Sequence, residues 1–339
     1  MIVQRGVNYD TERDVWDVAY VRRDMAAIRD ELHCDSVILL GSSLRRLVPA
    51  AEAAAERGLF VWFEPRKFEK GARRTLRFLA RTARAAEELR RDHPGVGISV
   101  GCEFTLFMKG LVPGRNWQAR ARNLGRPGSG DYHAGLNAFL GRALDAVRPV
   151  FGGPVTYSSG GWERVDWHGF DMVGVDLYRD ARNAADYRRL VRDLHRHGRP
   201  VLITEFGCCT FRGAADRGAL GFLAIDWRAR PPRLRDGIVR DEREQARYLD
   251  ELLDVFEAEN VHGAFVYDFV APGSPTAADP RYDLDTASFS LVKVAPPGSP
   301  DDYARTGRWE PKAAFHTVAA RFARPGGSTL SEQMENQQP

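Results

Sequence analysis

Short apolar runs alternate along the chain with longer segments in which apolar residues recur every three or four positions. The short runs are rich in β-branched and aromatic residues, as is typical of parallel strands covered on both faces. The longer segments have the period of amphipathic helices. We predict eight strands, over residues 6–9, 36–40, 59–63, 97–102, 155–158, 172–177, 201–205 and 264–269.

Eight strand–helix units within 339 residues favour one closed (β/α)8 TIM barrel over an open doubly wound sheet. An open sheet usually has a glycine-rich turn after its first strand, and residues 8–11 contain no glycine. We expect a single α/β barrel domain over residues 1–323 and a disordered tail over residues 324–339. Two long loops, residues 108–132 and 210–240, follow strands four and seven on the face where barrel enzymes hold their chemistry.

Composition excludes several classes of protein. The 49 basic and 46 acidic residues are interspersed, which is not the pattern of a nucleic-acid-binding surface. The first residues lack the pattern of a secretory signal, and no apolar run reaches membrane-spanning length, so we predict a cytoplasmic protein with no membrane partner. The four cysteines have no metal-ligand spacing and are predicted to be reduced thiols. We expect no metal or organic cofactor, and the sequence does not determine the oligomeric state.

Carboxylates stand at the ends of several predicted strands: Glu64, Glu103, Glu205 and Asp268. A carboxylate directly after a buried apolar run costs desolvation free energy and so calls for an explanation. Any one of them could cap a helix or pair with an arginine. Glu103 and Glu205 differ, because strands four and seven face each other across a barrel mouth. Their carboxyl groups can approach to the roughly 5 Å that a retaining glycosidase requires.

Residues 201–207, Val-Leu-Ile-Thr-Glu-Phe-Gly, resemble the strand-seven motif of clan A retaining glycoside hydrolases. This resemblance implies that Glu205 is the nucleophile. The acid/base glutamate of these families follows strand four, which corresponds to Glu103, and a tyrosine after strand six orients the nucleophile, which corresponds to Tyr178. Residues 309–315 resemble the closing helix of such barrels, so the likeness covers residues 1–322.

The chain departs from the clan A pattern at three strand ends. Cys102 stands where these families have an asparagine that binds the sugar 2-hydroxyl, a contact worth about 2 to 4 kcal/mol if nothing replaces it. The arginine common near the end of strand two is absent from residues 40–44, and Tyr267, Asp268 and Phe269 replace the usual tryptophan of strand eight. These departures keep two other hypotheses open. One is non-hydrolytic acid/base chemistry, such as a cyclisation or rearrangement; the other is a catalytically silent barrel that binds a carbohydrate or a protein.

The expected ligand is a small glycoside or a sugar-like compound. Asn8 and Tyr9 end the first strand, and both are predicted to point into the mouth. The aromatic rings of Trp162 and Trp227 could stack on a sugar or serve only in packing. The predicted substrate-binding residues are Asn8, Tyr9, Glu64, Cys102, Trp162, Tyr178, Trp227 and Asp268. A second, local resemblance joins residues 240–249 and 279–285 to bacterial proteins labelled abortive infection protein, a label that implies no mechanism.

Overall fold

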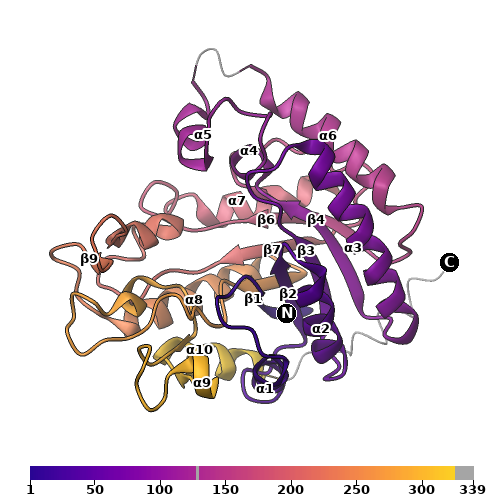
Figure 1. Ribbon diagram of the computed structural model, residues 1–339. Helices are drawn as coiled ribbons and strands as arrows, with labels where there is room; N and C mark the ends of the chain where they lie inside the picture. The colour runs from indigo at the N-terminus through magenta and orange to yellow at the C-terminus, as the bar shows by residue number, and fades with distance from the viewer. Residues whose placement is uncertain (127–129, 325–339) are drawn as a thin grey trace.

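The computed structural model describes residues 1–126 and 130–324. Eight parallel strands close into a barrel in the order β1-β10-β7-β6-β5-β4-β3-β2. All eight predicted strands are present, which confirms the (β/α)8 barrel (Figure 1). Their bounds are β1 (Gln4–Asp10), β2 (Ser36–Gly41), β3 (Phe60–Pro65), β4 (Val96–Cys102), β5 (Val155–Gly160), β6 (Val173–Asp176), β7 (Val201–Phe206) and β10 (Gly263–Val266).

Helices surround the barrel (Figure 1). Their buried apolar residues form one core with those of the strands. The larger ones are α1 (Val18–Asp30), α2 (Leu44–Ala55), α3 (Ala72–Asp92), α6 (Tyr132–Val147), α7 (Tyr187–Asp193), α8 (Glu242–Ala258) and α10 (Ala313–Phe322). The 3-10 helix η1 (Leu194–His197) extends α7. Within the described ranges, no helix combines the length and apolarity needed to cross a membrane.

The barrel interior is apolar over part of its depth. One buried cluster comes from alternate positions of β2, β3, β7 and β10, and it consists of Ile38, Leu40, Phe60, Trp62, Leu202 and Phe265. The indole nitrogen of Trp62 donates to Gln4 Oε1 at 2.8 Å, which satisfies its one polar atom. Polar and charged side chains occur instead at the carboxyl ends of the strands. The barrel is therefore a packed core that presents its chemistry at one end.

The two predicted loops contain structure of their own and contact each other. The first follows the short helix α4 (Phe104–Phe107) and includes α5 (Trp117–Asn123), and the second includes η2 (Gly218–Ala224) and a hairpin of β8 (Ile225–Asp226) and β9 (Arg233–Leu234). The rings of Trp117 and Phe222 lie 6.2 Å apart, centroid to centroid. Arg120 of the first loop is fully buried, and it anchors the loop by donating to Glu69 at 2.6 Å.

Ion pairs join the chain after β10 to the segment just before α8. This part contains η3 (Leu284–Ala287), β11 (Val292–Lys293), α9 (Tyr303–Thr306) and β12 (Glu310–Pro311). Arg240, just before α8, pairs with Asp283 at 3.1 Å and with Asp285 at 2.8 Å. The fully buried Lys312 pairs with Asp285 at 2.9 Å. The segments 240–249 and 279–285 therefore meet in the fold, where their charges tie three parts of the chain together.

Candidate active site

Glu205 lies at the end of β7, and two donors from other strands bind its carboxylate. The side chain is largely buried. Tyr178, which follows β6, donates its hydroxyl to Oε2 at 2.9 Å. Arg66, which follows β3, donates from Nη2 to Oε1. A phenol and a guanidinium thus favour the ionised form of this carboxylate.

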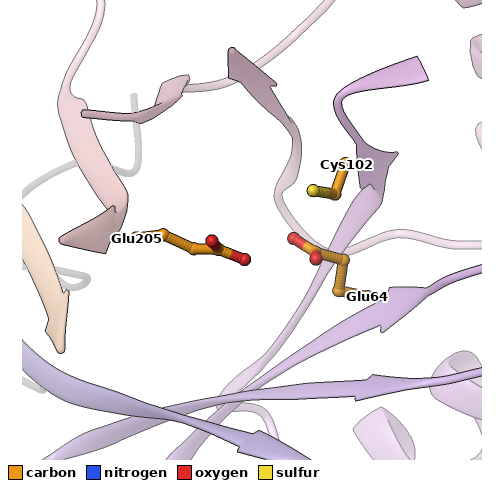
Figure 2. A group of neighbouring side chains, drawn as sticks. All are labelled: Glu64, Cys102 and Glu205. Carbon is orange, nitrogen blue, oxygen red and sulfur yellow. The ribbon is translucent and has the colours of Figure 1, made fainter. Parts of the chain in front are cut away.

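Arg66 also binds Glu64, so one guanidinium bridges two carboxylates. Its Nε lies 2.7 Å from Glu64 Oε1, and Ser158 donates its hydroxyl to the other oxygen. Figure 2 shows Glu64 and Glu205 pointing toward each other from opposite sides, with Cys102 beside them. One donor atom from each of these three residues lies within 4.8 Å of the others, as metal ligands would. The positive charge of Arg66 already compensates the two carboxylates, so the set is poorly suited to a second cation.

Glu103 lies directly after β4 in a left-handed backbone conformation, with φ of 40°. Its N–H donates to Ser158 O at 2.9 Å, which anchors the residue to β5. In the part of the chain that the structure describes, its carboxyl group accepts no hydrogen bond. Burial and the nearby Glu205 and Glu163 carboxylates raise the pKa of Glu103 well above its ordinary value. Glu103 is therefore suited to hold a proton.

The electrostatic environments of Glu205 and Glu103 differ. Burial raises the pKa of Glu205 as well, but Arg66 and Tyr178 oppose this rise. Within the described ranges no donor binds the Glu103 carboxyl group, and its pKa is raised further. When two adjacent carboxyl groups have environments that separate their pKa values, one can act as an acid while the other stays ionised. The two environments therefore favour a proton on Glu103 over a proton on Glu205.

A fourth carboxylate, Glu163, was missed by the sequence analysis. It accepts hydrogen bonds from Thr105 N at 3.0 Å, from Thr105 Oγ1 at 2.6 Å and from Tyr157 OH at 2.7 Å. Tyr157 in turn accepts from Phe104 N at 2.7 Å. These contacts fix the turn that begins at Glu103. Glu163 lies in the loop after β5, where its sequence gives no periodic or motif signal.

Asp176, the last residue of β6, was also missed. It accepts from Thr204 Oγ1 at 2.7 Å and from the Cys102 thiol at 3.4 Å. Burial, together with Glu205 and Glu103, raises the pKa of Asp176 well above its usual range. Burial likewise raises the pKa of the Cys102 thiol. Cys102 is thus a neutral thiol, which does not favour a nucleophilic role.

The side chains of Asn8 and Tyr9 were both expected to point into the mouth, but they point to opposite faces of β1. Successive side chains of a strand point to opposite faces. Asn8 lies inside the barrel, where Nδ2 donates to Thr204 O at 2.9 Å. Tyr9 points outward to α1, where its buried hydroxyl lies 2.8 Å from Asp24 Oδ2. The expected orientation is therefore corrected for Tyr9.

Trp162 and Trp227 occupy different surroundings. Trp162 is 38% exposed, and its indole nitrogen donates to Thr105 Oγ1 at 3.0 Å. Its ring lies so close to Gly160 that a Cβ there would be 2.4 Å from it. Trp162 is thus fixed beside the turn that carries Glu103. Trp227 is half exposed at the β8–β9 hairpin, and within the described residues no contact joins its ring to the carboxylates.

Asp268 follows β10 and is buried near Asp10, the last residue of β1. Burial raises the pKa of Asp268 to about 7, and the Asp10 carboxylate adds to this rise. Asp268 thus titrates near neutral pH at the mouth side of the barrel. Its side chain does not take part in the contacts of the Glu64, Arg66 and Glu205 cluster.

No family model matches the chain, and neither does any curated protein. Solved structures do match. A GH113 β-1,4-mannanase is 13% identical, covers 96% of this chain and 100% of its own, and gives a TM-score of 0.62. A β-glucuronidase from Bacteroides uniformis is 14% identical over 96% of this chain and 35% of its own, with a TM-score of 0.60. Cel5A from Thermotoga maritima, in complex with mannotriose, is 12% identical over 84% of this chain and 97% of its own, with a TM-score of 0.51. At these identities the likeness shows the fold, a barrel of the kind found in glycoside hydrolases.

Proposed function

We propose that this protein is a retaining glycosidase or transglycosidase in which Glu205 is the nucleophile and Glu103 the acid/base. The observation that carries the proposal is the contrast between the two carboxyl groups. Arg66 and Tyr178 bind Glu205, whereas burial beside Glu205 raises the pKa of Glu103. A double displacement needs one ionised and one protonated carboxyl at its start.

The proposed reaction has two balanced steps. In the first, a Glu205 oxygen forms a bond to the anomeric carbon while the bond to the leaving oxygen breaks and Glu103 gives its proton to that oxygen. In the second, ionised Glu103 takes a proton from water or from an acceptor hydroxyl, whose oxygen displaces Glu205 from the anomeric carbon. Tyr178 and Arg66 hold Glu205 in place, and they stabilise the negative charge on the Glu205 carboxylate when the sugar is released from it. Both steps use only groups of this chain and the substrates.

The matched structures suggest the first substrates to try. Their descriptions name a β-1,4-mannanase, a β-glucuronidase and a complex with mannotriose. We therefore propose a β-linked glycoside, with β-mannosides, β-glucosides and β-glucuronides as the first panel. The exposed Trp162 beside the Glu103 turn offers a flat apolar face for a sugar ring.

The decisive test is trapping of the covalent intermediate. A 2-deoxy-2-fluoro glycoside with a good leaving group slows both steps but lets the first proceed, so the glycosyl ester should accumulate on Glu205. Intact mass and peptide mapping would locate it. Glu205→Gln should abolish labelling. Glu103→Gln should still be labelled, because an activated leaving group needs no acid, but should release the sugar slowly. A folded wild-type protein that no sugar configuration labels would contradict the proposal.

One observation favours a second candidate function, non-hydrolytic acid/base catalysis. Next to Glu103, Cys102 and Asp176 contact each other, and burial raises the pKa of both groups, which favours their neutral forms. Such a neutral, buried surround also suits proton transfers within one molecule, as in a rearrangement. This candidate predicts no labelling of Glu205, while both Glu103→Gln and Glu205→Gln destroy an activity on a small molecule that is not a glycoside.

A further inference from the structure

A basic pocket of about 400 Å³ lies beside the mouth, between the start of α2 and the first turns of α3. The two helices are neighbours on one flank of the barrel (Figure 1). None of the residues that line the pocket is acidic. Its charged lining is entirely cationic and consists of Arg45, Lys67, Arg74, Arg77 and Arg81. This concentration of charge stands out in a chain whose formal net charge is only +3.

Among the residues that the structure describes, the four arginines have no anionic partner of their own. Arg74, Arg77 and Arg81 are spaced by three and four residues, which places them on one face of α3. Within the described part of the chain, no carboxylate lies within 4.0 Å of these three side chains or of Arg45. Elsewhere arginines are commonly paired, as in the contacts of Arg240 with three carboxylates. Like charges gathered in a hollow repel one another, and a bound anion would relieve that repulsion.

Polar groups complete the lining. Lys67 donates to Ser42 O and lies 4.4 Å from the centre of the Phe78 ring, so its ammonium is held at the wall of the pocket. The Ser43 hydroxyl makes no capping bond to α2, so in the described part of the chain this lining hydroxyl is not engaged by the helix that it precedes. Glu12 approaches from outside and accepts from Ser42 N at 2.7 Å. This loop therefore already binds one carboxylate at its edge.

We propose that this pocket binds a phosphate or sulfate group of a small molecule. Arginine presents a planar fork of donors that matches such groups, and several forks facing one hollow favour a compact, multiply charged anion. The volume is that of a small-molecule site, and the interspersed charges elsewhere on the chain do not form the extended stripe that a nucleic acid requires. The anion is either a free phosphate compound or the charged group of a substrate. The second source is considered because Lys67 directly follows Arg66, which binds Glu205 in the candidate active site.

Binding can be measured without any turnover. Calorimetry with inorganic phosphate, sulfate and pyrophosphate should show saturable binding at one site, weakened by added salt. Arg74→Gln and Arg77→Gln should each weaken pyrophosphate binding by about tenfold or more, as expected for the loss of a charge-assisted contact. Arg73→Gln is the matched control, because it removes the same charge from the same helix outside the pocket lining. Its affinity should change less than about threefold.

Three outcomes would overturn the proposal: no saturable binding of any of the three anions, equal weakening by Arg73→Gln and Arg77→Gln, or a single-stranded oligonucleotide that binds the same arginines more tightly than pyrophosphate. The source of the anion is distinguished by a kinetic arm. If the substrate carries the group, Arg77→Gln should raise KM for a 6-phosphorylated aryl glycoside but not for the unmodified one. If the ligand is a free compound, Arg77→Gln should leave both KM values unchanged. The binding result does not depend on the proposed glycosidase activity.

Discussion

The hydroxyl of Tyr178 lies 2.9 Å from Glu205 Oε2, while Arg66 donates to the other oxygen of the same carboxylate. Each oxygen of the proposed nucleophile therefore has its own donor, one neutral and one charged. Tyr178 also packs edge-on against Phe289, with ring centroids 5.9 Å apart, so the position of its hydroxyl is fixed by packing. The arrangement stabilises the charged form of Glu205 in a buried place.

Tyr178→Phe should lower kcat about tenfold to a hundredfold, because a hydrogen bond to a buried charge is lost. Without this donor the pKa of Glu205 should rise, so the acidic limb of the kcat/KM profile should move to higher pH. Tyr187→Phe is the control, since that buried hydroxyl donates to Leu177 O, outside the carboxylate cluster. A pH profile unchanged in Tyr178→Phe would show that the tyrosine does not act on the nucleophile.

The strand pattern predicted the barrel, and it predicted that Glu103 and Glu205 lie at the same end of the barrel. A buried apolar run that ends in a carboxylate can be recognised from local sequence alone. The strand pattern did not predict Arg66. An arginine was sought after strand two, and the one that binds the nucleophile comes from β3. Glu64 and Arg66 are two residues apart, which places them on the same side of an extended strand. That spacing is the signal that could have identified their pairing.

Other features depended on contacts that have no local signature. The role of Glu163 rests on the loop path that brings it to Thr105 and Tyr157. The opposite orientations of Asn8 and Tyr9 follow from strand alternation, because they are successive residues of β1. In the basic pocket, Arg74, Arg77 and Arg81 share one face of α3, but Arg45 and Lys67 come from other segments and join them only in the fold.

Glu163→Gln should impair the acid role of Glu103 specifically. The substitution removes a like charge that raises the pKa of Glu103, and it weakens the contacts that fix Thr105. The pKa of Glu103 should fall, so the basic limb of the pH profile should move to lower pH. With a poor leaving group kcat/KM should drop by about tenfold, because general acid catalysis then matters most. With an activated aryl leaving group the loss should nearly vanish.

The dependence on the leaving group is the feature that a merely structural role would not reproduce. Glu87→Gln is a suitable control, since Glu87 binds Arg90 and Gly152 away from the mouth. Equal losses on both substrate types in Glu163→Gln would mean that the substitution disturbs the fold of the turn rather than the proton transfer.

Cys102→Asn tests whether the thiol limits the choice of sugar. An amide at this position would supply donors beside Glu103, and in the resembling families such an amide binds the sugar 2-hydroxyl. The ratio of kcat/KM for a glycoside over its 2-deoxy analogue should therefore rise by about tenfold or more. Cys102→Ser, which adds no amide, should leave that ratio near its wild-type value. An unchanged ratio in Cys102→Asn would show that the sugar does not present its 2-hydroxyl here.

Asp268 should make folding stability dependent on pH near neutrality. Its pKa in the folded protein is raised to about 7, chiefly by burial, from about 3.9 in an unfolded chain. Between these two pH values the folded state keeps a proton that the unfolded state has lost. Stability therefore falls as pH rises from about 4 to 7, and it is lowest once Asp268 is ionised in both states. A difference of about three pKa units corresponds to roughly 4 kcal/mol at most.

Asp268→Asn should remove this pH dependence, because the amide keeps the shape of the side chain and does not ionise. At pH 8 the variant should resist urea more than the wild type, by roughly 2 to 4 kcal/mol in the free energy of unfolding, while at pH 4.5 the two should be closely matched. Asp279→Asn is the control, because the pKa shift of Asp279 has the opposite sign to that of Asp268. The exposed Asp279 pairs with Arg281, which lowers the pKa of Asp279, so that variant should gain nothing at high pH. Parallel stability curves for wild type and Asp268→Asn between pH 4.5 and 8 would contradict this prediction. They would mean that Asp268 is ionised in the folded protein well below pH 7. In that case the pKa-lowering effect of Arg13 and Lys312 would outweigh the pKa-raising effect of burial and Asp10.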